Sequence, residues 1–85
     1  MDWAEWYDWE IELSAHLLKR MVDRGFSETD LRIIMDSATG FRDSASQGRF
    51  VLESTLAGAS WEVVVEPDHV DNLLVVVTAY SLTGP

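Results

Sequence analysis

The chain has 85 residues, a length that holds one domain with a small core and excludes a second one. Its composition, 47% hydrophobic and 25% charged, is that of a globular protein and excludes intrinsic disorder. It has no cysteine, which excludes disulfides and thiolate sites, and no apolar run near the roughly 20 residues that span a bilayer, so we expect a soluble cytoplasmic protein with no membrane contact.

The formal net charge is −9, from six Lys plus Arg against fifteen Asp plus Glu. All the basic residues lie within residues 19–49, whereas residues 1–18 and 50–85 carry acids and no Lys or Arg. Affinity for nucleic-acid phosphates depends on Lys and Arg, so the bulk charge opposes binding to a long nucleic acid. Any basic patch must therefore be local, and a basic protein partner is easier to reconcile with this charge.

Residues 1–10, MDWAEWYDWE, form an aromatic and acidic N-terminal arm. Trp3, Trp6 and Tyr7 are spaced i, i+3, i+4, which places them on one face of a helical turn. Such rings, and the ring of Trp9, are useful at interfaces because each joins a large apolar area to a polar edge. The arm either folds back onto its own small core or contacts a partner or a second copy of the chain.

Residues 9–13 alternate apolar and acidic side chains, as a half-buried edge strand does. Ser14 is a good N-cap for a helix that ends at Gly25, where a residue without Cβ accepts the left-handed conformation. Ser27 begins a second helix with acids in its first turn, and Gly40 ends it. Both predicted helices carry a core-facing apolar stripe.

The second half of the chain predicts a short edge strand and then three strands joined by turns. The predicted strands cover residues 41–43, 50–56, 61–66 and 73–80, with turns at 57–60 and 67–72. We expect Trp61 to lie in the core. The last strand, LLVVVTAY, is apolar on both faces, which indicates an inner strand or one that meets a partner.

This order of elements predicts an α+β fold with two N-terminal helices packed on one face of an antiparallel three- to four-stranded sheet, in a single domain of residues 11–82. The opposite face of that sheet would be exposed unless the N-terminal tryptophans or a second subunit cover it.

Four segments, HLLKRMVDRGFSETDL, GRF, WEVVVEPD and VVVTAY, together resemble a small bacterial family of domains of unknown function. The similarity runs from about Ser14 to Tyr80. That family is grouped with the RelE-like and BrnT-like ribonuclease toxins of the barnase/colicin/RelE-like superfamily. The resemblance thus implies a RelE-like toxin fold and RNA cleavage that needs no metal and no cofactor.

Such cleavage requires a base for the 2′-hydroxyl, an acid for the leaving oxygen and cations for the charge on phosphorus. The matching positions give a catalytic set of His16, Arg20, Arg49 and Tyr80, with Arg24 and Arg42 as substrate-binding residues. His16 would act as base or acid, the arginines would clamp phosphate, and Tyr80 would donate a proton or stack on a base.

Structural roles compete with each of these assignments. His16 can be a first-turn helix residue bonded to the backbone or to a carboxylate, and Arg20, Arg24 and Arg49 can form salt bridges to acidic strands. Tyr80 can be a core or capping residue. With two histidines and no cysteine in the chain, we expect no metal site.

The sequence therefore predicts a small cytoplasmic RelE-like toxin or ribonuclease-related domain, with RNA as substrate and an antitoxin as partner. The alternative is a non-catalytic interaction domain on the same fold, as a homodimer or bound to another protein. A third interpretation, an acidic mimic of nucleic acid, rests on the net charge alone.

Overall fold

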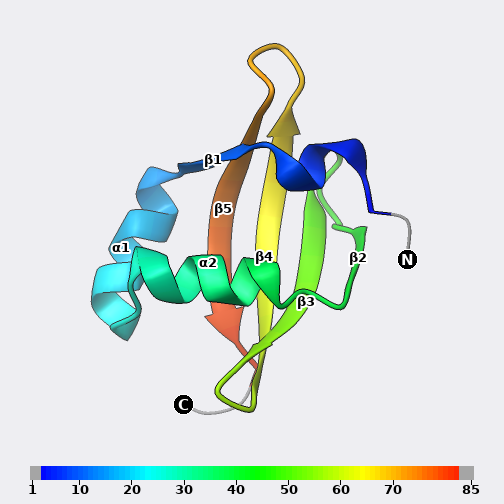
Figure 1. Ribbon diagram of the computed structural model, residues 1–85. Coiled ribbons are helices and arrows are strands. Elements are labelled where there is room, and N and C mark those ends of the chain that lie inside the picture. Colours follow the sequence, from blue (N-terminus) through cyan, green and yellow to red (C-terminus); the bar gives the residue numbers. More distant parts are fainter. Residues whose placement is uncertain (1–2, 83–85) are drawn as a thin grey trace.

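The computed structural model describes residues 3–82, which form one five-stranded sheet, two α-helices and a short 3-10 helix (Figure 1). In chain order the elements are η1 (Glu5–Asp8), β1 (Glu10–Leu13), α1 (Ala15–Arg24), α2 (Glu28–Asp36), β2 (Gly40–Asp43), β3 (Phe50–Leu56), β4 (Ala59–Asp68) and β5 (Leu73–Ser81). The strand order across the sheet is β1-β5-β4-β3-β2.

The α+β class and the two helices agree with the prediction, whereas the details of the sheet do not. The sheet has five strands and is mixed, because β1 pairs with β5 in the parallel direction, with Glu10 beside Leu73 and Leu13 beside Val76. The helices also follow the first strand, so they are not N-terminal to the sheet. Alternation of apolar and polar residues predicts a strand but carries no information on its direction, and β1 and β5 lie near opposite ends of the chain.

Ser14 caps α1 and fixes it to the sheet. Its side-chain oxygen accepts a hydrogen bond from the Leu17 N–H at 3.0 Å, and its hydroxyl donates to the Val77 carbonyl in β5 at 2.7 Å. The helix ends at Gly25, which has a φ of +71° as predicted for a left-handed cap. Because β1 pairs only with residues 73–76, the rest of β5 is left for α1 to pack against.

Helix α2 begins as predicted and ends earlier than predicted. Ser27 and Asp30 form a reciprocal capping box with bonds of 3.0 and 3.1 Å. The helix ends at Asp36, not at Gly40, because the Thr39 N–H already donates to the Glu53 carbonyl of β3 at 2.8 Å. No helix within residues 3–82 is long and apolar enough to cross a membrane.

Both predicted turns of the sheet are shorter in the structure. The β3–β4 hairpin turns on Ala57 and Gly58, with φ of +51° and +82°, which is the two-residue geometry that matches strand twist. The strand β4 continues through Pro67 to Asp68 rather than ending before the proline. Its pairing with β3 stops at Val65, so Pro67 lies where β4 is an edge strand and tolerates a residue with no N–H.

The core lies between the sheet and a layer made of η1 and α2, with α2 crossing the strands in Figure 1. Trp6 is 6% exposed, and its ring centroid lies 5.0 Å from that of Phe50 and 5.3 Å from that of Phe41. Trp3 stacks on Tyr7 at 4.3 Å. The described part of the predicted arm, from Trp3 on, therefore folds back onto the core, while residues 1–2 of that arm lie outside the described residues.

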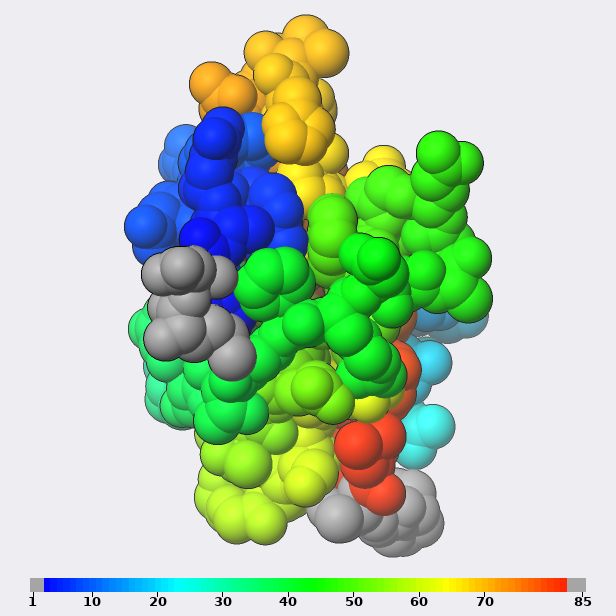
Figure 2. All heavy atoms as spheres, turned by 90° about the vertical axis from the view of Figure 1, so that its right-hand side faces the viewer, coloured from blue at the N-terminus to red at the C-terminus, as the bar shows by residue number. Residues whose placement is uncertain are grey.

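The opposite face of the sheet, which we call the outer face, is not covered by these tryptophans, contrary to one expectation. They pack on the same face as α2, because the rings of Phe41 and Phe50 are on that face. In Figure 2 the blue atoms of η1 and the teal atoms of α2 lie on one side of the molecule, and only some cyan atoms of α1 are visible at its opposite edge. Strand β5 lies between β1 and β4, so the sheet order agrees with the first of the two interpretations of this apolar strand, an inner strand.

We predict that Trp6→Ala lowers the free energy of unfolding by about 3–5 kcal/mol, because it removes a buried indole and leaves a cavity. Urea denaturation followed by circular dichroism measures the change. Val70→Ala is the control, since Val70 is 90% exposed and should change stability by less than about 0.5 kcal/mol. A loss below about 1 kcal/mol for Trp6→Ala would show that this ring is not a core residue.

Candidate functional site

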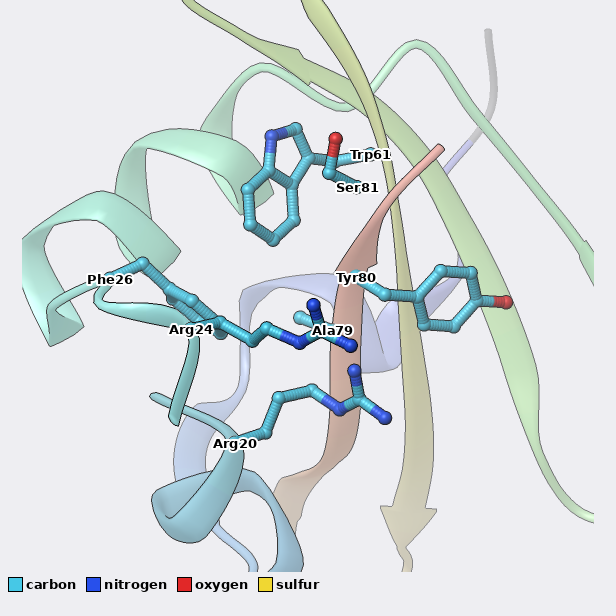
Figure 3. Close-up of a pocket in the computed structure, with 7 residues that line it drawn as sticks. All are labelled: Arg20, Arg24, Phe26, Trp61, Ala79, Tyr80 and Ser81. Atoms are coloured by element: carbon cyan, nitrogen blue, oxygen red, sulfur yellow. The ribbon is translucent and has the colours of Figure 1, made fainter. Parts of the chain in front are cut away.

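A pocket of about 310 Å³ lies between α1 and the final residues of β5 (Figure 3). We call it the arginine pocket, and its lining residues are Arg20, Arg24, Phe26, Trp61, Ala79, Tyr80 and Ser81. Arg20 and Arg24 lie one turn apart on α1, and in Figure 3 both side chains extend from the helix toward β5. The indole of Trp61 is drawn on the other side of the same hollow.

The two arginines of this pocket differ from the other arginines in the described part of the chain. Arg32, Arg42 and Arg49 each hold a glutamate at 2.9–3.1 Å. Within residues 3–82, neither Arg20 nor Arg24 has a carboxylate within 4.0 Å. The Arg20 Nε is also buried and has no hydrogen-bond acceptor among the described residues. A buried donor of this kind is costly unless an acceptor binds it, so the pocket is suited to an anion.

His16 lies next to this pocket on the same helix. It is exposed, and it lines a shallow hollow of about 210 Å³ together with Lys19, Arg20, Asp23 and Arg24. The two hollows share both arginines. An anion bound by the arginines would therefore be close to the imidazole of His16.

Tyr80 contributes to the wall of the pocket, but its hydroxyl is directed elsewhere. Figure 3 shows its ring pointing away from Arg20 and Arg24, across β4. The hydroxyl donates to the Glu62 carboxylate at 2.7 Å, and this bond, with burial, raises the pKa of Tyr80 above its usual value. The Tyr80 hydroxyl therefore keeps its proton, which it donates to Glu62 on the outer face of the sheet.

Glu62 is the centre of a polar network on the outer face. Its carboxylate side chain is 13% exposed, and it lies opposite Glu53 in the β3–β4 register, where like charges repel. Arg42 offsets this repulsion, since its two terminal nitrogens lie 2.9 Å from Glu53 and from Glu62. The hydrogen bond from Tyr80, together with Arg42, holds the pKa of Glu62 below its usual range. The pKa of Arg42 is raised in turn by its bond to Glu62.

Two predicted site residues, Arg42 and Arg49, are thus found in cross-strand ion pairs. Arg49 pairs with Glu66 at 2.9 Å, and both side chains are close to half exposed. Such exposed pairs contribute about 0–1 kcal/mol each to stability. Neither residue lines the arginine pocket, so the structure brings together Arg20, Arg24 and Tyr80 with His16 beside them, and leaves Arg42 and Arg49 outside.

Trp61 is the pocket residue that the sequence assigned to the core. It packs against the core cluster, yet it remains partly exposed and lines the arginine pocket. It is the third residue of β4, close to the hairpin turn, and this position near the end of the sheet is the sequence feature that could have indicated its partial exposure. Within residues 3–82, no three His, Asp or Glu side chains gather in a way that could hold a metal ion.

The family model described as "Domain of unknown function (DUF4258)" matches residues 13–81. No curated protein and no solved structure matches the chain. The match covers most of the chain and includes α1, both walls of the arginine pocket and the Glu62 network. The chain therefore belongs to this family.

We predict that Tyr80→Phe raises the pKa of Glu62, because it removes the hydrogen bond that lowers it. A lowered folded-state pKa gives stability that is present above the unfolded carboxyl pKa of about 4.3 and is lost as pH falls through the folded value. The variant should therefore show a smaller loss of stability in this window below about pH 4.3. NMR titration of the Glu62 carboxyl carbon and urea denaturation against pH measure both effects.

Tyr7→Phe serves as the control for this experiment, because it removes a hydroxyl that donates to the Met35 carbonyl and not to Glu62. An unchanged Glu62 titration in Tyr80→Phe would contradict the assigned cause.

Proposed function

We propose that this member of the DUF4258 family is a small cytoplasmic ribonuclease-related domain of the RelE-like toxin type, which binds the RNA backbone in the arginine pocket. The observation that supports this proposal is the pair Arg20 and Arg24, which line one pocket without an acidic partner among the described residues. The family match itself gives no activity, so the relation to ribonuclease toxins rests on the sequence resemblance and this geometry.

Because the chain is strongly acidic, two arginines with no acidic partner among residues 3–82 are unusual. With fifteen acidic residues against six Lys plus Arg, an arginine on the surface has acids available, and Arg32, Arg42 and Arg49 use them. Arginine binds phosphate through two parallel N–H donors. Two guanidinium groups that lie one helical turn apart, and that bind no described carboxylate, are therefore suited to a phosphate ligand.

The arrangement also allows a reaction that needs no metal and no cofactor. His16 would accept the proton of the ribose 2′-hydroxyl, whose oxygen attacks the adjacent phosphorus. Arg20 and Arg24 would stabilise the negative charge that builds on the phosphate oxygens. The 5′ oxygen leaves and takes a proton from solvent, so the products are a 2′,3′-cyclic phosphate and a free 5′-hydroxyl. In this scheme Tyr80 shapes the pocket wall.

We predict that Arg20→Ala combined with Arg24→Ala weakens RNA binding by at least tenfold and removes cleavage, because it deletes both phosphate contacts. His16→Ala should remove cleavage and leave binding within about twofold. Fluorescence anisotropy with a labelled single-stranded RNA measures binding, and gel analysis of the products measures cleavage.

Arg32→Ala is the matched control for these variants. It removes one positive charge from an exposed helix position whose partner is Glu28, away from the arginine pocket. It should bind RNA within about twofold of the wild type. Equal weakening by Arg32→Ala would show a general charge effect, and wild-type protein that cleaves no RNA at any salt concentration would end the ribonuclease proposal.

A second candidate function, a protein-interaction domain, is favoured by the exposed apolar side of α1. Leu18 is 49% exposed and Val22 is 82% exposed, and their spacing of four residues puts them on one helix face. A second copy of the chain or an antitoxin could bind there. Of the N-terminal rings proposed for an interface, Trp6 is buried within the subunit, whereas Trp3, Tyr7 and Trp9 remain partly exposed.

If α1 forms a homodimer contact, Val22→Glu should abolish the self-association that sedimentation equilibrium detects in the wild type, because it puts a charge into an apolar contact. Val70→Glu makes the same change at a residue that is 90% exposed in the β4–β5 turn, and it should leave association unchanged. A wild-type protein that stays monomeric at high concentration would exclude the homodimer.

A further inference from the structure

Trp61 forms an aromatic wall of the arginine pocket and is held in place by its neighbour. Its ring meets that of Phe26 edge-on, with centroids 5.2 Å apart and an angle of 72° between the planes. Phe26 is 8% exposed and belongs to the core cluster, so it supports the indole of Trp61 on the side that faces the core. The part of the Trp61 ring that remains exposed faces the pocket as a rigid platform.

The platform and the two cations lie on different sides of one hollow. Figure 3 shows the indole of Trp61 across the pocket from the guanidinium groups of Arg20 and Arg24. A ligand that fits both must carry a flat ring at one end and an anion at the other, and a nucleotide has this form. The volume of about 310 Å³ is at the small end of the roughly 300–1,000 Å³ of ligand pockets, so it suits one such unit.

The surrounding charges restrict how much nucleic acid can approach. Asp23 lines the adjoining hollow together with both arginines. Glu62 accepts the hydrogen bond of Tyr80, which is part of the pocket wall. A further hollow, which Trp61 also lines, has Glu53 and Glu62 in its wall. These carboxylates would repel the closely spaced phosphates of a duplex, whereas one or two phosphates can be bound by the arginines alone.

We propose that the arginine pocket recognises one unpaired nucleotide of a single-stranded RNA, with the base stacked on Trp61 and its phosphate on Arg20 and Arg24. The choice of RNA rests on the proposed function, but the recognition of a base and a phosphate together does not require cleavage. Bases in single strands are free to stack on aromatic side chains, whereas those of a duplex are covered by their neighbours.

The test uses a labelled tetranucleotide with 2′-O-methyl riboses, which cannot be cleaved, and inorganic tripolyphosphate as a competitor that has no base. Trp61→Leu should weaken tetranucleotide binding about tenfold and leave tripolyphosphate binding unchanged, because it removes the ring and keeps both arginines. Trp61→Phe should stay within about threefold of the wild type. Since one phosphate is bound, a plot of the logarithm of affinity against the logarithm of salt concentration should have a slope of about −0.7.

Trp9→Leu is the matched control, since Trp9 packs on His69 at 5.2 Å and does not line the pocket. Circular dichroism checks that each variant is folded. A measurement on the wild type covers the case in which Trp61→Leu does not fold: a nucleoside monophosphate should compete at least tenfold better than ribose 5-phosphate, which lacks the base.

Three results would overturn the inference: equal weakening of tetranucleotide and tripolyphosphate binding in Trp61→Leu, equal competition by the two monophosphates, or binding of a duplex as tight as that of the single strand. Failure of the ribonuclease proposal looks different. In that case the wild type binds the tetranucleotide in a Trp61-dependent manner, and unmodified RNA stays intact.

Discussion

Ser14 makes the two hydrogen bonds on which the position of α1 depends. One caps the helix at the Leu17 N–H, and the other reaches the Val77 carbonyl of β5, while Leu17 itself is fully buried. The helix can come this close because β1 covers only the first half of β5. Once α1 is fixed there, Arg20 and Arg24 extend from it toward β5, and together with Trp61 they line the arginine pocket.

The same chain uses its arginines in two ways, and geometry decides which. On the outer face, the antiparallel register places Glu53 opposite Glu62, and this repulsion is offset by Arg42. At the edge of the sheet no acid reaches Arg20 and Arg24 among the described residues, so their charge is available to a ligand. A strongly acidic protein can therefore contain a local anion site, provided that the acids are held by other contacts.

The sequence predicted part of this site. Arg20 and Arg24 are four residues apart on a helix that was correctly bounded by Ser14 and Gly25, so their common direction could be read from the spacing. The roles of Arg42 and Arg49 could not be read in this way, because ion pairing depends on which strands are neighbours and on their register. The alternation of apolar and polar residues around Trp61 predicts a core position. The pattern does not show that this residue lies near the end of the sheet, where its ring stays partly exposed.

The sequence by itself determined the α+β class, both helix starts and the approximate strand segments, because capping residues, periodicity and turn residues act over a few neighbours. Only the tertiary structure decided that β1 adds a parallel fifth strand, that Trp6 enters the core, and that Tyr80 is bonded to Glu62 rather than facing the arginines. These features join residues far apart in the chain, and their free energies depend on packing and charge that no local pattern contains.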